Sequence, residues 1–128
     1  EILAIVHDTG FKRGVGAISS INNWYGNDDI PLGAYKGIFG DGHSDGVQGN
    51  STAEQNRYAQ DLISKMPGST KDYDDVPSAV ELLRKTLAAQ EDNSVVISSI
   101  GMTTNMRDLV QSKGGDQYSP LNGHDLIA

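Results

Sequence analysis

The chain has 128 residues, of which 37% are hydrophobic and 21% are charged, and its formal net charge at pH 7 is -7. This length is enough for one domain with a real core. The acidic balance argues against nucleic acid and against an anionic membrane surface as partners, because both attract basic patches. No apolar run approaches the roughly eighteen residues of a membrane-spanning helix. The sequence has no cysteine, which excludes disulfides and thiolate metal sites.

The first third of the chain predicts a strand, a helix and a second strand. Residues 2–7 form a short apolar run typical of a parallel strand, and Asp8 and Thr9 follow it in a loop. Apolar residues then recur at helical spacing up to the helix stop at Gly26, namely Val15, Ile18, Ile21 and Tyr25. Residues 31–35 predict a strand that begins at a proline. This order favours a right-handed crossover and a parallel sheet.

Residues 37–50 form a long loop that contains five glycines. A loop of this length inside a compact domain is usually functional or disordered. Because it has few apolar anchors, we expect it to be among the most mobile segments. Asn50-Ser51-Thr52 is an N-glycosylation acceptor in a secreted protein only, so the sequence leaves a secreted and a cytoplasmic location equally open.

Two further helices are predicted by their start signals. Residues 51–54 and 78–81 both have the spacing of a capping box. Each is followed by an apolar stripe at helical spacing, formed by Tyr58, Leu62 and Met66 in the first case and by Val80, Leu83 and Leu87 in the second. Later in the chain, Pro120 suits a helix start.

Residues 94–110 predict a strand, a loop and a helix. The β-branched run within residues 94–99 suits a strand that is buried on both faces. Gly101 then allows unusual backbone angles, Thr103 and Thr104 can cap a helix, and Met106 begins a helical stripe. The loop lies at the carboxyl end of the strand, which is where open α/β sheets bind ligands.

Together these elements predict one α/β segment over residues 1–128. We expect a Rossmann-like open, mainly parallel sheet with helices on both faces. The sheet is expected to be incomplete, because the apolar ends at Ile2 and Ile127 need neighbours from outside this sequence. A second copy of the chain or a complementing chain is therefore an expected partner.

The stretch Ile100-Gly-Met-Thr-Thr-Asn105 resembles the Gly-Pro-Leu-Thr-Asn loop of the inosine-uridine preferring nucleoside hydrolases, with Met102 and Thr103 in place of Pro and Leu. Four more stretches are similar to that family in the same order, at residues 18–26, 29–37, 80–90 and 119–123. The resemblance implies a nucleoside hydrolase-like fold, calcium as cofactor, and hydrolysis of the N-glycosidic bond of a small-molecule ribonucleoside.

The resemblance also implies roles for individual residues. In the family, the backbone carbonyl of the residue before the loop glycine is a calcium ligand. Because that glycine corresponds to Gly101, the resemblance makes the backbone carbonyl of Ile100 a candidate calcium ligand, and calcium takes oxygen ligands of this kind. The loop after the first strand lines the nucleoside pocket, so Asp8 and Thr9 become candidate substrate contacts. The alternative for Asp8 is a loop residue held by local hydrogen bonds. His43 becomes a candidate to protonate the leaving group, the alternative being a solvated loop histidine.

One departure from the family keeps two functions open. The family's Asp-x-Asp-x-x-x-Asp-Asp motif, which supplies calcium ligands and the general base, does not occur in this sequence. The first hypothesis is a nucleoside hydrolase whose activity belongs to a longer parent protein, with this chain inactive alone. The second is a non-enzymatic structural or binding protein that reuses the fold, since fold does not dictate function.

Overall fold

The computed structural model describes residues 1–36, 57–66 and 68–128. Along these parts of the chain the elements are β1 (Ile5–His7), α1 (Gly14–Trp24), β2 (Leu32–Ala34), α2 (Arg57–Lys65), the 3-10 turn η1 (Tyr73–Asp75), α3 (Ala79–Ala88), α4 (Thr104–Gln111) and α5 (Gly123–Leu126). None of the helices in these parts is long and apolar enough to cross a membrane.

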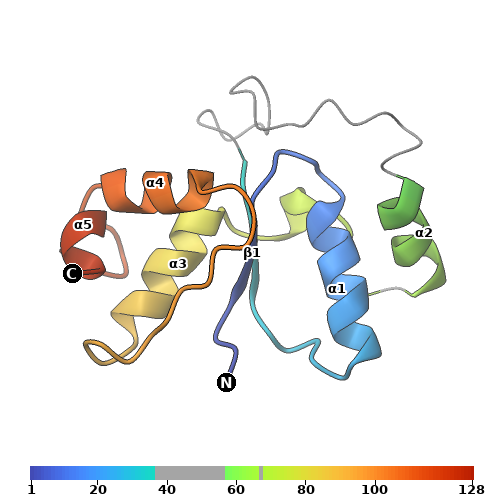
Figure 1. Ribbon diagram of the computed structural model, residues 1–128, viewed down its shortest axis with the longest axis horizontal. Helices are drawn as coiled ribbons and strands as arrows, with labels where there is room; N and C mark the ends of the chain where they lie inside the picture. Colours follow the sequence, from blue (N-terminus) through green and yellow to red (C-terminus); the bar gives the residue numbers. More distant parts are fainter. Residues whose placement is uncertain (37–56, 67) are drawn as a thin grey trace.

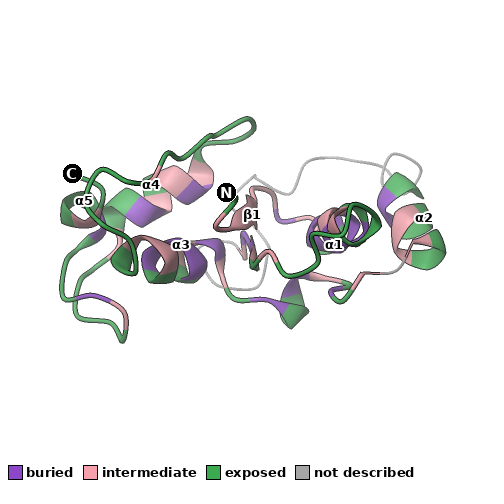
Figure 2. Cartoon of the chain, turned by 90° about the horizontal axis from the view of Figure 1, so that it is seen from below, coloured by how far each residue is buried: buried purple, intermediate pink, exposed green. Residues whose placement is uncertain are grey.

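The two strands lie in the middle of the molecule between two groups of helices. Helices α1 and α2 cover one side, while α3, α4 and α5 lie on the other (Figures 1 and 2). Strands β1 and β2 pair in parallel, with Ile5 opposite Leu32 and His7 opposite Ala34. The prediction of an α/β chain with a parallel sheet is thereby confirmed, for a small sheet of two strands among the described residues.

Helix α1 forms where its apolar pattern predicted it. Val15 is fully buried and packs in a cluster with Ala34, Tyr73 and Val76. Gly16 allows the helix to approach the chain before η1, since a Cβ there would lie 2.1 Å from the Lys71 carbonyl oxygen. The helix ends before Gly26, whose φ of 72° is the left-handed conformation expected of a helix stop.

The predicted start of α3 is confirmed as an N-cap, because the Ser78 hydroxyl accepts a hydrogen bond from the Glu81 amide at 3.2 Å. The reciprocal half of a capping box does not form, since the Glu81 carboxylate accepts from the Tyr118 hydroxyl. The buried face of α3 is centred on Ala79, Leu82 and Leu83, whereas Val80 and Leu87 of the predicted stripe are only half-buried. The helix is thus rotated slightly from the orientation that its apolar stripe predicted.

Helix α4 is held by Leu109, which is among the most completely buried side chains. Thr103 occupies the position before its first turn but makes no side-chain capping bond there. The prediction of a helix starting at Pro120 is wrong by a few residues, because Asn122 caps α5 by accepting a hydrogen bond from the Asp125 amide. The predicted helix after residues 51–54 corresponds to α2, while that capping box and the loop of residues 37–50 lie outside the described residues.

The predicted strand at residues 94–99 is wrong. This segment has no strand hydrogen bonding, and all of it except Val95 is exposed, with Val96 at 93%. A β-branched run becomes a strand only when a neighbouring strand and packed faces are available. The described residues supply neither of these to the segment, so local preference alone does not form the strand.

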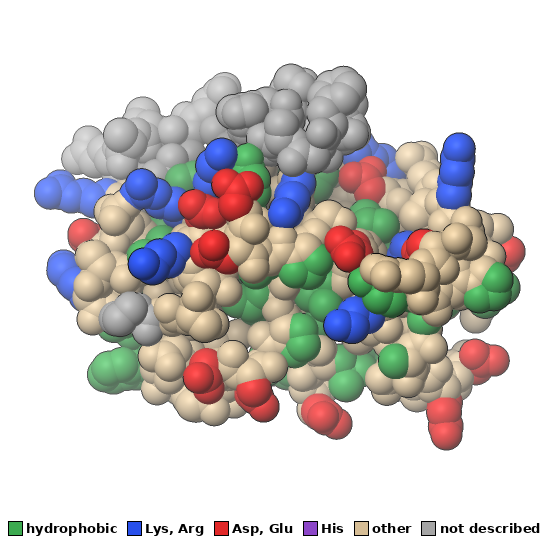
Figure 3. Space-filling model, turned by 180° about the vertical axis from the view of Figure 1, so that it is seen from behind, with side chains coloured by type: hydrophobic (Ala, Val, Ile, Leu, Met, Phe, Trp, Pro, Cys, Tyr) green, Lys and Arg blue, Asp and Glu red, His purple; other side chains and the backbone are tan. Residues whose placement is uncertain are grey.

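Apolar side chains also reach the surface in other parts of the molecule, where they lie between scattered acidic and basic side chains (Figure 3).

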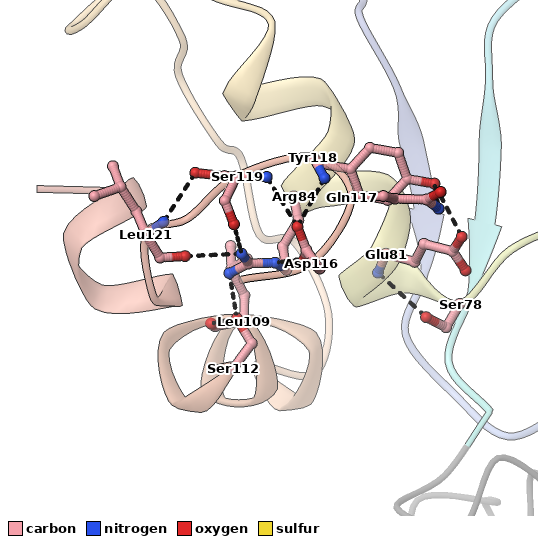
Figure 4. A network of polar contacts seen from close by, with 10 residues as sticks. All are labelled: Ser78, Glu81, Arg84, Leu109, Ser112, Asp116, Gln117, Tyr118, Ser119 and Leu121. Atoms are coloured by element: carbon pink, nitrogen blue, oxygen red, sulfur yellow. Dashed lines mark hydrogen bonds and ion pairs between the residues drawn. The ribbon is translucent and has the colours of Figure 1, made fainter. Parts of the chain in front are cut away.

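A buried arginine fastens the C-terminal loop to α3 (Figure 4). The Arg84 side chain is only 3% exposed and forms an ion pair with Asp116. It also donates to the Ser112 hydroxyl at 2.9 Å and to the Leu121 carbonyl at 2.8 Å. The Arg84 guanidinium and the Ser119 amide lower the pKa of the Asp116 carboxyl group to about 2.

This pair makes stability depend on acid. Because the pKa of Asp116 is lower in the folded than in the unfolded chain, the stabilisation is complete above about pH 4 and is lost as the pH falls through about 2. We expect Arg84→Met to lower the free energy of unfolding at pH 7 by about 2–3 kcal/mol. Between about pH 4 and pH 2, the free energy of unfolding should fall less steeply in this variant than in the unsubstituted chain. Urea unfolding at a series of pH values measures both effects.

The control is Arg107→Met, which removes an exposed arginine paired with Asp108. Such surface pairs contribute about 0–1 kcal/mol. The free energy of unfolding of this variant should therefore depend on pH as it does in the unsubstituted chain. An Arg84→Met chain with an unchanged acid slope would contradict the role given to the pair.

Candidate functional site

The candidate site is the edge of the sheet at which both strands end. β1 ends at His7 and β2 at Ala34, and these residues lie opposite each other in the parallel register. Two loops meet at this edge. One follows β1, and the other precedes α4 and runs toward β1 (Figure 1). The carboxyl edge of a parallel sheet is where α/β proteins bind ligands.

The first link between the two loops is made by Asp8. Its Oδ2 atom accepts a hydrogen bond of 2.6 Å from the backbone amide of Met102, 94 residues along the chain. Gly101 makes this approach feasible, since a Cβ at that position would lie 1.9 Å from the same carboxylate oxygen. A side chain at position 101 and the Asp8–Met102 bond therefore exclude each other.

The second link is made by Asn105 in the first turn of α4. Its Nδ2 atom donates to the carbonyl oxygen of His7 at 3.1 Å, and the backbone amide of Tyr35 donates to the same oxygen at 2.9 Å. A carbonyl oxygen can only accept, so the nitrogen end of the Asn105 carboxamide must face His7 and its oxygen end must face away. The end of β1 thus joins β2 to the start of α4.

The imidazole of His7 lies between the loop after β1 and the start of α1. A Cβ at Gly14 would lie 2.1 Å from its Nε2 atom, so the start of α1 packs directly on the ring. Burial lowers the pKa of His7 below 6.5, although the Asp8 carboxylate and the hydrogen bond with Thr9 partly oppose this. The ring is therefore neutral near pH 7, and its Nε2 atom lies 3.4 Å from the Thr9 hydroxyl.

The structure brings together some of the residues that the sequence singled out. Asp8 and Thr9 lie in the half-buried loop at the end of β1, and Ile100 lies in the loop that Asp8 holds, with 98% of its surface exposed. His43 lies outside the described residues. Sequence reasoning did not single out Asn105 as a site residue, although a polar residue beside a glycine loop at a strand's carboxyl end is a usable signal.

Calcium fits poorly to the described residues alone. They contain no group of three or more acidic or histidine side chains close enough together to hold a metal ion. The candidates are the Ile100 carbonyl, which the family resemblance names, and the Asp8 carboxylate in the loop after β1, one oxygen of which already accepts from Met102. Calcium takes about six to eight oxygen ligands. These two residues would therefore supply only a minor part of a calcium site.

Comparisons with known proteins add no relative: no family model, no curated protein and no solved structure matches this chain.

The contact at Gly101 gives a coupled prediction. Gly101→Ala should lower the free energy of unfolding by about 1–2 kcal/mol, because Asp8 must rotate away from Met102. In an Asp8→Ala background the same change should be nearly neutral, since nothing remains to collide with the new methyl group. A double-mutant cycle followed by chemical unfolding measures this coupling.

The matched control is Asp28→Ala, which removes an exposed loop carboxylate elsewhere. In that background the Gly101→Ala penalty should be unchanged. Equal penalties in the Asp8→Ala and Asp28→Ala backgrounds would rule out the contact.

Proposed function

We propose that this chain forms the sheet edge of a ribonucleoside hydrolase that cleaves the N-glycosidic bond, within a longer parent protein of nucleoside hydrolase-like, Rossmann-like fold. The observation that carries the proposal is the hydrogen bond from the Met102 amide to Asp8. It joins the loop after β1, which the family resemblance places at the nucleoside pocket, to the Gly101 loop, which the resemblance places at the calcium ion.

The chemistry of the edge suits this substrate. Ribose hydroxyl groups are hydrogen-bond donors, and a carboxylate such as that of Asp8 accepts up to four hydrogen bonds, of which the Met102 amide uses one. The Thr9 hydroxyl can both donate and accept. Cleavage of a glycosidic bond passes through an oxocarbenium-like state with developing positive charge. A fixed carboxylate near the sugar stabilises that charge more than a mobile one, because it needs no reorganisation.

Other parts of the proposal come from the resemblance alone. These are the calcium ion, the carbonyl of Ile100 as one of its ligands, and His43 as the group near the leaving base. In the family an Asp-rich motif supplies most calcium ligands and the general base, and this sequence lacks that motif. The residues of this chain would therefore bind and orient the sugar, while the water-activating groups would come from the rest of the parent protein.

The rival proposal is a non-enzymatic structural or binding protein with the same fold. The departure from Pro-Leu to Met102 and Thr103 in the resembling loop favours it. The two proposals differ in what the parent protein holds ahead of Glu1: an intact Asp cluster favours the hydrolase, and unrelated residues favour the scaffold.

An assay of ribose release separates the two functions. The purified chain alone should release no ribose from inosine or uridine, with or without calcium. The parent protein should release ribose in a calcium-dependent manner, and Asp8→Ala in the parent should lower kcat/KM by about tenfold or more, as expected for the loss of a charged hydrogen bond.

Asp28→Ala in the parent serves as the control and should leave kcat/KM unchanged. A parent protein without hydrolytic activity would support the structural or binding role. Enzymatic turnover by this chain alone would contradict the proposal that the water-activating groups lie in the rest of the parent protein.

A further inference from the structure

The segment of residues 94–100 has free backbone groups along its whole length. It runs from the turn after α3 toward the start of α4 without helix, turn or bend, and all of it except Val95 is exposed (Figure 1). No backbone N–H or C=O group of residues 95–100 forms a hydrogen bond with the described parts of the chain. A straight segment of this kind can accept a further strand, because its unpaired backbone groups are available for pairing.

The sequence of this segment lacks the features that usually protect a free strand edge. Proteins block such edges with charged side chains, prolines or bulges. The stretch Ser94-Val-Val-Ile-Ser-Ser-Ile100 contains no charged residue and no proline, and its β-branched run favours a strand. Val96 and Ile100 are almost fully exposed. Pairing with a partner strand would therefore bury apolar surface as well as satisfy backbone groups.

A hollow of about 490 Å³ lies beside this segment, between the end of α3, the loop before α5, and α5 itself. Val95 and Ile97 both line it and Val96 does not, as expected where alternate side chains point to opposite sides. The larger apolar side chains of its wall are those of Leu87, Val95, Ile97, Leu121, Leu126 and Ile127. A strand added here would place its own alternate side chains against this wall.

The charged residues at the hollow are acidic. Glu91, Asp92 and Asp125 line it, and no lysine or arginine lies among the described residues that do. The Asp125 carboxylate is engaged, since it accepts from Asn122 at 2.8 Å and lies 3.2 Å from the His124 ring. The exposed carboxylates of Glu91 and Asp92 have no partner in the described part of the chain. The C-terminal end of the α3 dipole adds negative potential, so the rim is complementary to a positive charge.

A second copy of the chain does not supply that charge. Residues 91–102 contain no lysine or arginine, so two copies paired through this segment would bring only further carboxylates to the interface. Each copy also carries a net charge of -7, and like charges oppose association. The charge of the rim thus favours a different protein as the partner.

We propose that residues 94–100 and the adjoining hollow bind an extended segment of another protein, with apolar side chains at alternate positions and lysine or arginine beside them. Backbone hydrogen bonds to residues 95–100 hold the segment, its apolar side chains occupy the hollow, and its basic side chains reach Glu91 and Asp92. The hollow lies at the end of α3, whereas α3 begins beside β2, where Ser78 bridges to Ala34. The docking surface is therefore separate from the sheet-edge site and does not require the hydrolytic reaction.

The test is a titration of the ¹⁵N-labelled chain with the peptide acetyl-Lys-Lys-Val-Thr-Val-Thr-Val-Lys-Lys-amide, which has lysines at both ends and so suits either strand direction. Saturable shifts of the amide signals of residues 95–100 are expected, with slower exchange of these amide protons with solvent. The same peptide with glutamate in place of lysine should bind about tenfold more weakly or less, because its charges repel the rim. No saturable shift with the lysine peptide, or equal affinity for both peptides, overturns the proposal.

Two variants separate the charge from the apolar wall. The double substitution Glu91→Lys with Asp92→Lys changes two exposed side chains and should reverse the preference between the peptides. Ile97→Ser removes apolar surface from the wall and should weaken binding of the lysine peptide about tenfold. The matched control is Ile21→Ser on α1, since Ile21 is 43% exposed and Ile97 is 39% exposed, and it should bind like the unsubstituted chain.

The variants can also overturn the proposal. Unchanged affinity in the Ile97→Ser chain, or an unreversed preference in the double variant, would place peptide binding elsewhere. A dimer mass by sedimentation, with signals of residues 95–100 that shift on dilution in the absence of peptide, would make a second copy the occupant and contradict the partner proposed.

Discussion

The carbonyl oxygen of His7 is the point on which the arrangement of this chain depends. It accepts the Tyr35 amide from the end of β2 and the Asn105 carboxamide from the start of α4. The first bond continues the parallel ladder, and the second ties in a helix that follows 98 residues later. The Asp8–Met102 bond ties the loop before α4 to the same edge. The position of one strand end thus sets both the sheet and the candidate site.

The contacts that stabilise the C-terminal part of the chain also hold part of the candidate site in place. Leu109 buries α4 against its neighbours, and Arg84 fastens the loop after α4 to α3. These interactions hold the helix that presents Asn105. A change far from the edge, such as the loss of Arg84, would therefore also loosen the candidate site. Binding measurements on such variants need a parallel measurement of stability.

The sequence predicted the elements whose causes are local. The apolar spacing around Val15 and the stop at Gly26 define α1, and the Ser78 cap defines the start of α3. Parallel pairing of β1 and β2 followed from the strand–helix–strand order. The strand predicted around Val96 was wrong, because a strand needs a partner strand. The β-branched residues of this segment do not indicate whether a partner strand is present.

The candidate site was predictable only in part, for the same reason. Asp8 was found from its place after a strand, and the glycine loop from its resemblance to a family. The bond between them, and the role of Asn105, join residues more than 90 positions apart. Nothing in the local sequence around Tyr35 indicates that its amide shares an acceptor with the side chain of Asn105. Such pairings emerge only when the chain is folded.

The shared acceptor can be tested directly by nuclear Overhauser measurements on the labelled chain. If the Tyr35 amide and the Asn105 carboxamide both donate to the His7 oxygen, each of these protons lies about 2 Å from that atom. The two protons are then close neighbours, and a cross-peak between them is predicted, with the Asn105 side-chain signals shifted from their free positions. The absence of that cross-peak, with Asn105 side-chain signals at the positions of a free carboxamide, would contradict the account.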